Sequence, residues 1–549
     1  MAGNPSAIED RESNSPVLFH TWPFLVFLLV VLPVFFALRR TRLWLPWLTL
    51  ASYFFYGWWN PYYLVLVLYS TFLDFCLVAL MDHCPGEQRP SSALARLRRL
   101  EFGDRALKVA FLGASAATLT ALGLAVAGPK TLRPTMGGAS VLLLLMALGA
   151  FYRSRRIWLL ISLVNNLALL LFFKYARFVA QNLNALLAWT HVPLKLADPS
   201  ALMPLGFQYL LPAGISFFTF QSLSYTIDFY LGNVKRERNF LRFATFVCFF
   251  PQLMAGPIER ARHLLPQFAQ FPAIRLQNFT DGASLFLVGL FKKLALANYL
   301  SFYVERVYDN PRAFGAPALM LATVAFGWQI FCDFSGYTDM ARGVAKVMGF
   351  DLILNFDNPY LATGLGQFWS RWHISLSSWF RDYVYIPLGG NRYGTLNTYR
   401  NLFLTFFISG IWHGANWTFV IWGALHGLGV VVTRELERSA FYRERVPKLP
   451  KQLGVFAFVS FTWIFFRAGS LDDALLIIGR IFTAGWQDPQ IPALMLLLMA
   501  SVWLYEFLYE SRFRKLLARG SVRLSLAVLM MLYLCFCASG GRPFIYFQF

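Results

Sequence analysis

The sequence predicts an all-α polytopic membrane protein with about a dozen transmembrane helices and additional re-entrant or interfacial helices. Of its 549 residues, 57% are apolar and only 14% are charged, whereas about 25% of the residues in a soluble domain are charged. Long uncharged runs recur along the chain, and a helix of about 20 apolar residues crosses a bilayer. Aromatic residues make up 18% of the chain, as expected for spans anchored at both interfaces by tryptophan and tyrosine.

The net charge of +21 is explained by membrane topology, because lysine and arginine collect in the cytoplasmic loops of multi-span proteins. No nucleic-acid-binding signature interrupts the apolar runs. We therefore expect the lipid bilayer, and no nucleic acid, as a partner. The six cysteines show no paired spacing of metal ligands, so we expect neither a disulfide nor a metal site.

Apolar segments of spanning length define the expected organisation. In chain order they are 17–38, 43–59, 61–81, 109–128, 139–152, 157–180, 206–231, 280–302, 314–333, 401–433, 452–467, 489–510 and 524–540. Two shorter pieces, 241–256 and 368–386, are predicted to be re-entrant or interfacial. We interpret 17–549 as a single membrane domain.

The orientation of the first span follows from its flanking charges. A polar tail, 1–16, carries three acidic residues, whereas Arg39, Arg40 and Arg42 follow the span. The positive-inside rule therefore predicts an N-terminus outside the cell and places 39–42 in the cytoplasm. We expect the span to remain uncleaved, because it lacks a convincing signal-peptide cleavage site.

His413 is the strongest candidate for a functional residue. It lies in 401–433, a run of 33 residues without Asp, Glu, Lys or Arg. As one helix this run would be about 50 Å long, against a hydrocarbon core of about 30 Å, so the helix is strongly tilted or broken. Ser409, Gly410 and Gly414 bracket the histidine, and Gly/Ser pairs are a known cause of kinks. A break there would leave free backbone groups beside the imidazole.

The alternative for His413 is a packed histidine that donates one hydrogen bond to a carbonyl. We favour a functional role because an ionisable group at membrane depth is costly. Trp412 is its neighbour in sequence, and Asn416 would lie on its face if the helix continued.

Residues 351–400 mix charges, tryptophan, proline and glycine in a way that a lipid-facing span does not tolerate. Irregular backbone survives at membrane depth only where protein buries it or it lines a cavity, so we expect 351–433 to form the catalytic region. Within it, Trp369, His373 and Ser377 are spaced by four and would share one helical face.

Arg371 and Asp382 add charges to this segment that must be paired or hydrated. The alternative for the segment is an interfacial amphipathic helix with anchoring tryptophans and a snorkelling arginine. We expect the five remaining histidines to be structural or solvated, with His426 the strongest candidate for an exception.

Several motifs resemble one known family. Phe368–Ser377 and Ser409–Gly414 resemble the membrane-bound O-acyltransferases, in the branch of alginate O-acetylation and teichoic acid D-alanylation. Supporting stretches are Gly214–Gln221, Pro251–Ile258, Cys332–Ala341, Asn355–Tyr360 and Phe544–Phe549. The resemblance covers about 17–81 and 153 to the end, and it makes 82–152 an insertion with two extra spans.

The resemblance implies a bacterial cytoplasmic (inner) membrane enzyme that transfers an acyl group, expected to be acetyl, to a hydroxyl. It has no bound cofactor in this interpretation. The donor would be a cytoplasmic thioester, acetyl-CoA or an acyl carrier protein thioester. The acceptor would be an exported polysaccharide or cell-wall glycan, reached from the outer side directly or through an exported SGNH-type acyltransferase or esterase.

His413 matches the family's histidine and His373 the second histidine of this branch, and by analogy they would meet in a central tunnel. Asn358 belongs to a supporting motif. Asn416, or a backbone N–H near Gly414, would be a donor to the oxyanion that forms during acyl transfer.

Two other functions compete with this interpretation. A transporter or flippase of an acyl or glycan intermediate would show inverted repeats with interrupted helix pairs, and the sequence shows neither. A protein or lipid O-acyltransferase is a third possibility within the same enzyme class. The acceptor polymer stays open between alginate, cellulose, peptidoglycan and other glycans.

Overall fold

The computed structural model describes residues 18–84, 105–127, 133–203 and 209–538, and these contain helices and no strand. The chain divides into two compact units. The first unit contains Arg40–Leu253 and Arg260–Phe271, and the second contains Val17–Arg39, Met254–Glu259 and Pro272–Phe549. The predicted tail 1–16 and the last motif, Phe544–Phe549, lie outside the described residues.

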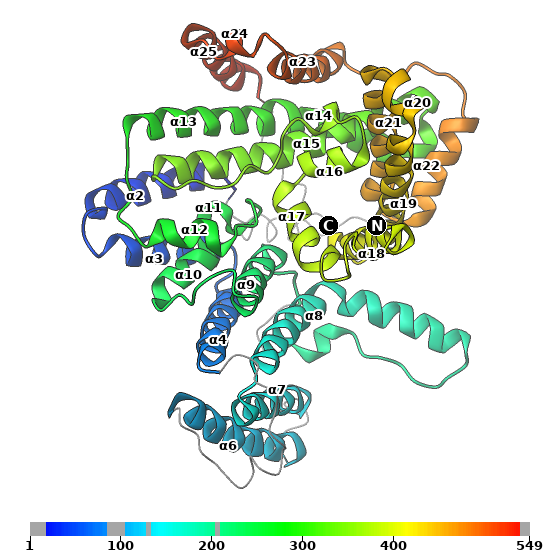
Figure 1. Ribbon diagram of the computed structural model, residues 1–549. Helices are drawn as coiled ribbons and strands as arrows, with labels where there is room; N and C mark the ends of the chain where they lie inside the picture. Colours follow the sequence, from blue (N-terminus) through cyan, green and yellow to red (C-terminus); the bar gives the residue numbers. More distant parts are fainter. Residues whose placement is uncertain (1–17, 85–104, 128–132, 204–208, 539–549) are drawn as a thin grey trace, which may run out of the picture. The chain divides into compact units, whose positions relative to one another are not determined.

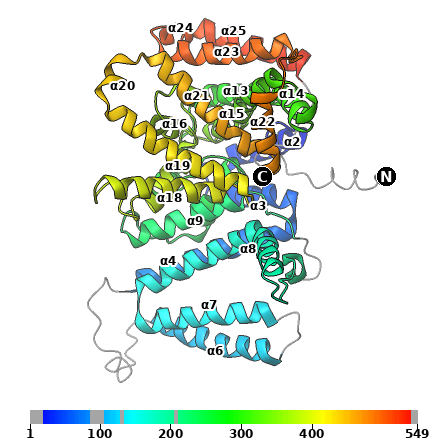
Figure 2. The same cartoon turned by 90° about the vertical axis from the view of Figure 1, so that its right-hand side faces the viewer.

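The first unit is a bundle of membrane-length and shorter helices. Its elements are α3 (Trp44–Trp59), η1 (Pro61–Tyr63), α4 (Leu64–Asp82), α6 (Arg105–Ala127), α7 (Arg133–Tyr152), α8 (Arg155–Trp189), η2 (Pro199–Leu202), α9 (Ile215–Tyr230), α10 (Phe240–Cys248), α11 (Phe250–Leu253) and α12 (Ala261–Phe268). Helices α6 and α7 pack side by side as a hairpin (Figure 2). They lie within the predicted insertion, and the described part of its predicted spans, 109–127 and 139–152, is helical.

A buried carboxylate joins two helices of the first unit. Asp74 of α4 accepts hydrogen bonds from the hydroxyl of Ser162 at 2.6 Å and from Nδ2 of Asn166 at 2.9 Å, both on α8. All three side chains are buried. Neutral donors therefore satisfy this carboxylate, and the bonds tie α4 to α8 where lipid offers no competing partner.

The second unit carries the remaining helices. They are α2 (Trp22–Leu38), α13 (Leu276–Phe291), η3 (Lys292–Ala297), α14 (Asn298–Tyr308), η4 (Pro311–Ala313), α15 (Ala316–Val347), η5 (Pro359–Leu361), α16 (Leu365–Arg371), α17 (Ile374–Phe380), η6 (Arg381–Tyr385), α18 (Thr395–His413), α19 (Trp417–Arg438), α20 (Ala440–Arg445), α21 (Lys448–Arg467), α22 (Leu471–Thr483), α23 (Ala493–Glu510), α24 (Arg514–Leu517) and α25 (Gly520–Cys537). Helix α15 is the most buried of the candidate spans in this unit, with 83% of its apolar window enclosed. It therefore forms the centre of the unit.

Glycines bring α13 and α15 into backbone contact along their length (Figure 1). A Cβ atom at Gly282 would lie 2.6 Å from the carbonyl oxygen of Gly343, and one at Gly289 would lie 2.5 Å from that of Gly336. The two glycines on each helix are seven residues apart, or about two turns, so both contacts fall on one face. Small residues of this kind permit close helix packing in membranes.

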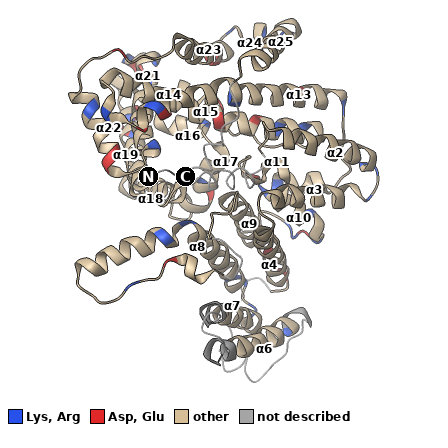
Figure 3. Cartoon of the chain, turned by 180° about the vertical axis from the view of Figure 1, so that it is seen from behind, with Lys and Arg blue, Asp and Glu red and all other residues tan. Residues whose placement is uncertain are grey.

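Charged residues are sparse along the long helices (Figure 3), and two lysines beside α15 are paired with its carboxylates. Lys293 of η3 lies 2.7 Å from Asp333 of α15, and both side chains are less than 5% exposed. Lys292 pairs with Asp339 at the same distance. Because these pairs neutralise the carboxylates, α15 continues for 32 residues instead of ending at 333 as the sequence predicted.

The described part of the chain contains eight helices long and apolar enough to cross a membrane. They are Pro61–Asp82, Arg155–Trp189, Leu276–Tyr308, Ala316–Val347, Trp417–Arg438, Lys448–Arg467, Ala493–Glu510 and Gly520–Cys537, with shorter apolar helices at Trp22–Leu38, Lys108–Ala121 and Ala139–Tyr152. The polytopic helical class is thereby confirmed. The pieces predicted to be re-entrant or interfacial consist of helices of nine residues or fewer.

Other predicted boundaries differ as well. The predicted span 401–433 is two helices, α18 and α19. In the described part of the predicted span 206–231, residues 209–231, the helix begins at Ile215, because Gly214 before it adopts a left-handed backbone with φ 70°. By contrast, the predicted span 43–59 agrees with α3, whose 16 residues extend about 24 Å.

Candidate functional site

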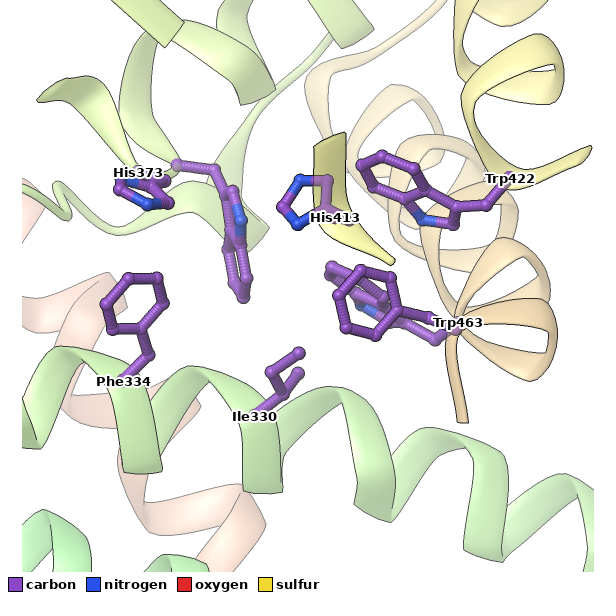
Figure 4. A pocket seen from close by; sticks show the side chains of 8 residues that line it. Ile330, Phe334, His373, His413, Trp422 and Trp463 are labelled. Carbon is purple, nitrogen blue, oxygen red and sulfur yellow. The ribbon is translucent and has the colours of Figure 1, made fainter. Parts of the chain in front are cut away.

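One pocket in the second unit contains both histidines that the sequence singled out. It is lined by Ile330, Phe334, Trp372, His373, His413, Trp422, Trp463 and Phe466. Figure 4 shows the imidazoles of His373 and His413 on one side of the pocket, with Ile330 and Phe334 of α15 on the other. Both histidines therefore line one pocket, and that this pocket belongs to a central tunnel stays a prediction.

His413 is placed by a helix break. Helix α18 ends at His413, Gly414 is extended, and α19 starts at Trp417 after the cap residue Asn416. A Cβ atom at Gly414 would lie 2.2 Å from the ring of Phe419, so only glycine allows this turn. The predicted break beside His413 is confirmed, and the alternative of one tilted helix is wrong.

The two helices joined by this break pack against each other (Figure 2). A Cβ atom at Gly410 would lie 2.8 Å from Cα of Gly423, so a glycine on each helix allows the close crossing. The crossing brings Trp422, one residue before Gly423, to the pocket with His413.

The walls around His413 are aromatic. Its ring is 4.9 Å from that of Trp422 and 5.3 Å from that of Phe466, both nearly perpendicular to it. Trp412 packs beside it at 5.0 Å. His413 is 6% exposed, so this imidazole is shielded from bulk water.

His373 lies in a sharp turn between α16 and α17. Its backbone is left-handed, with φ 42°, a conformation that is uncommon for residues other than glycine and recurs at functional sites. The turn separates Trp369, which is on α16, from Ser377, which is on α17. The prediction that Trp369, His373 and Ser377 share one helical face is therefore wrong, because the helix does not run through 372–373.

Asn355 determines the tautomer of His373. Its side-chain oxygen accepts hydrogen bonds from the backbone N–H of Ser375 at 3.2 Å and from the Ser375 hydroxyl at 2.9 Å. A backbone N–H can only donate, so the atom facing it is the amide oxygen. Nδ1 of His373 lies 3.1 Å from that same oxygen and must therefore carry its hydrogen. Nε2 is then the acceptor nitrogen of the ring.

His373 lies outside the eight candidate spans and is 1% exposed. Burial lowers the pKa of His373 to about 3, because desolvation disfavours the charged imidazolium. The ring is therefore neutral at physiological pH. A neutral imidazole with an acceptor Nε2 can accept a hydrogen bond, or a proton, from a hydroxyl.

His426 is a packed residue. Nε1 of Trp369 donates to its Nδ1 at 3.3 Å. Because an indole N–H only donates, Nε2 of His426 carries the hydrogen, and it donates to Thr462 Oγ1 at 2.9 Å. Both ring nitrogens are satisfied, in agreement with a structural role for His426. The ring of His426 packs against that of Trp422, with the two ring centroids 4.7 Å apart.

Arg371 and Asn358 lie beside the pocket and do not line it. Arg371 forms an ion pair with Glu510 of α23, and its Nη1 donates to the carbonyl oxygens of Asp357 and Asn358 at 3.4 Å each. Asn358 has a left-handed backbone, with φ 45°. The charge of Arg371, predicted to be paired or hydrated, is therefore paired with Glu510.

Ser377 and Asp382 make local contacts. Ser377 Oγ donates to the carbonyl of Trp372 at 3.0 Å, and Asp382 pairs with the adjacent Arg381 at 2.9 Å. Neither residue is among those that line the pocket.

Trp369, Trp412 and Asn416 support the pocket walls. Trp369 is buried against Trp422, and Trp412 is buried beside His413. Asn416 caps α19, since its Oδ1 accepts from the N–H of Thr418 at 3.2 Å and its Nδ2 donates to the carbonyl of Gly469 at 3.0 Å. The expectation that Asn416 shares a helical face with His413 is wrong, because α18 ends before it. Its suggested role as an oxyanion donor stays a prediction.

The chain is similar in sequence to a family of membrane enzymes. A model of MBOAT, the membrane-bound O-acyltransferase family, matches residues 234–471. The chain is 42% identical to a probable alginate O-acetylase of Pseudomonas putida, over 60% of this chain and 66% of the relative. It is 36% identical to a peptidoglycan O-acetyltransferase of Helicobacter pylori, over 59% and 64%. It is 30% identical to a teichoic acid D-alanyltransferase of Streptococcus thermophilus, over 47% and 67%.

The chain belongs to the membrane-bound O-acyltransferase family. It is accordingly a membrane protein, in agreement with its spans. All eight residues that line the pocket lie inside the segment matched by the model of this family. The matched segments span a little under two thirds of the alginate O-acetylase and peptidoglycan O-acetyltransferase relatives.

Sequence reasoning missed most of the pocket. Asn355 was noted only as part of a motif, although an amide next to an irregular segment is a usable signal for a side chain that orients another. Trp422, Trp463 and Phe466 gave no signal, because aromatic residues are common throughout the spans of this family member. Ile330 and Phe334 were likewise indistinguishable from core residues of a buried helix.

Proposed function

We propose that this protein is a membrane O-acyltransferase that moves an acyl group, expected to be acetyl, from a cytoplasmic thioester to a hydroxyl on the outer side of the membrane. The observation that carries the proposal is the meeting of His373 and His413 in one buried pocket of a chain from this family. The activities for which the three relatives are named, two O-acetyl transfers and one D-alanyl transfer, support the reaction class.

The reaction needs a base, and His413 is placed to be one. Its Nε2 or Nδ1 takes the proton of the acceptor hydroxyl as the oxygen attacks the thioester carbonyl. As the C–S bond breaks, the imidazolium returns that proton to the departing thiolate, so the products are an ester and a free thiol. His413 is the last residue of α18, where the helix dipole favours the transient positive charge.

His373 contributes to the same step by binding the acceptor hydroxyl. Because Asn355 holds its Nδ1–H, its Nε2 accepts a hydrogen bond and can orient the hydroxyl. The aromatic walls contributed by α15, α19 and α21 exclude water, which protects the thioester from hydrolysis.

The donor and the partners follow from the resemblance. We assign acetyl-CoA or an acyl carrier protein thioester as donor, with no bound cofactor. We assign an exported polysaccharide, a cell-wall glycan or an exported SGNH-type relay protein as acceptor. The bacterial cytoplasmic membrane, with the N-terminus outside, is the location consistent with the basic residues at 39–42.

The test is acyl transfer by purified protein in proteoliposomes. Free thiol release from acetyl-CoA or an acyl carrier protein thioester is measured together with acetyl ester formation on alginate, cellulose and peptidoglycan fragments. His413→Ala is expected to abolish both signals, whereas His83→Ala, at an exposed helix end, retains them. Persistent transfer by His413→Ala refutes the assignment, and movement of a glycan across the bilayer without ester formation supports a flippase instead.

A further inference from the structure

Two carboxylates on α23 lie against the segment that carries His373. Glu506 and Glu510 are four residues apart and therefore share one face of α23. Glu506 is 4% exposed, although an acidic side chain is rarely buried in a membrane span without a function. It interacts electrostatically with Lys292 and Arg371. Glu510 forms an ion pair with Arg371, and both side chains are mostly buried.

Arg371 links α23 to two chain segments at once. Its Nη1 donates to the carbonyl oxygens of Asp357 and Asn358 at 3.4 Å each. Its own carbonyl accepts from the N–H of Asp357 at 2.9 Å. The guanidinium therefore holds the turn at 357–358 against the end of α16, and Glu510 holds the guanidinium.

The same two segments carry the pocket histidine. Two residues before Asp357, the carbonyl of Asn355 accepts from the N–H of Ile374 at 2.9 Å, and its side chain holds Nδ1 of His373. The backbone bonds 357–371 and 355–374 form a short ladder, and His373 lies between the two bonded positions 371 and 374. Any displacement of Arg371 is transmitted along this ladder to the imidazole.

We propose that Glu510 is a positioning residue for His373, acting through Arg371 and the 355–358 turn. The proposal rests on the proposed function and deepens it, because it makes α23 part of the machinery that aligns the acceptor hydroxyl. An ion pair that only anchored α23 would affect stability and leave the geometry of His373 unchanged.

The first experiment removes the carboxylate. Glu510→Ala is expected to lower kcat by about tenfold to a hundredfold, the effect of a displacement near 1 Å, with KM for the thioester within about twofold. Glu510→Asp, which keeps the charge, is expected to recover most of the activity. Arg371→Lys is expected to resemble Glu510→Ala, because an ammonium cannot reproduce the guanidinium fork.

The matched control is Glu444→Ala, which removes the acidic partner of an exposed ion pair, Arg443–Glu444. It is expected to retain the wild-type kcat. A Glu510→Ala protein that folds and has a kcat within about twofold of the wild type overturns the proposal.

A double variant tests the route of action. If Glu510 and Asn355 both act through His373, adding Glu510→Ala to Asn355→Ala costs less than a further twofold in kcat. Independent effects would multiply, and that result also overturns the proposal.

Hydrogen exchange provides a readout that needs no catalysis. Glu510→Ala is expected to speed amide exchange in the peptide 353–375 by at least about tenfold, and Glu444→Ala to leave it unchanged. Unchanged exchange in Glu510→Ala refutes the proposal that Glu510 holds the 355–358 turn through Arg371. If the wild type is inactive but exchange is accelerated in Glu510→Ala, the proposed function is refuted and this positioning role of Glu510 is supported.

Discussion

Nδ1 of His373 and the side-chain oxygen of Asn355 are 3.1 Å apart, and this contact decides which nitrogen of the imidazole can accept a proton. The contact links two chain segments through a polar group at a buried position. Such an orienting partner is a common companion of a reactive histidine, and it yields the first prediction.

Replacing Asn355 with alanine should release the tautomer and orientation of His373. We expect kcat for acyl transfer to fall by about a hundredfold, at the lower end of what a positioned acid or base contributes. The measurement is transfer by purified protein, with Asn397→Ala as control, since Asn397 is half-buried and its Nδ2 donates to the carbonyl of Tyr393 just before its own helix. Equal rates in both variants would remove Asn355 from the site.

The buried imidazole of His373 should make the protein sensitive to acid. Its folded pKa, about 3, lies below the ordinary value of 6.5, so the unfolded chain takes up the proton first. The stabilisation is complete above pH 6.5 and is lost as the pH falls toward 3. Between pH 7.5 and 5.5 the loss is about 1.4 kcal/mol.

The measurement is the melting temperature of detergent-solubilised protein across this pH range. His373→Gln lacks the titrating group and should show a smaller decline than the wild type. Parallel curves for the two proteins would mean that His373 does not titrate in the unfolding reaction.

His426 should behave as a structural residue. His426→Leu keeps the volume but leaves the Trp369 N–H and the Thr462 hydroxyl without the ring that they bond. Each unsatisfied group costs about 1–3 kcal/mol, so we expect a lower melting temperature. Activity per folded molecule should stay within about tenfold of the wild type, in contrast with His413→Ala. Complete loss of activity at an unchanged melting temperature would assign chemistry to His426.

The α13–α15 contact should tolerate no side chain at its glycines. A Cβ atom at Gly289 would lie 2.5 Å from the carbonyl of Gly336, so Gly289→Ala is expected to destabilise the protein by about 1–3 kcal/mol. Gly454→Ala, on α21 with nothing within 4 Å of its added Cβ, serves as the matched control and should be neutral or stabilising. Similar melting temperatures for the two variants would show that the helices can separate without cost.

Local composition was enough to find the spans and His413. The charge-free run around His413 exposed the cost of an ionisable group at that depth, and Gly410 and Gly414 located the break. The same reasoning failed at His373, because four-residue spacing suggested a continuous helix and a left-handed residue interrupts it. That turn depends on bonds from Asn355, 18 residues away, which no local pattern contains.

The sequence by itself determined that this chain is a helical membrane protein, that the helix around His413 is strongly tilted or broken, and that both histidines match one enzyme family. These properties depend on composition and short-range spacing. Only the tertiary structure decided that α15, α19 and α21 supply the aromatic walls, that Asn355 selects the tautomer of His373, and that α23 reaches Arg371. Contacts between residues distant in the chain arise from helix packing, and residue spacing along one helix does not encode them.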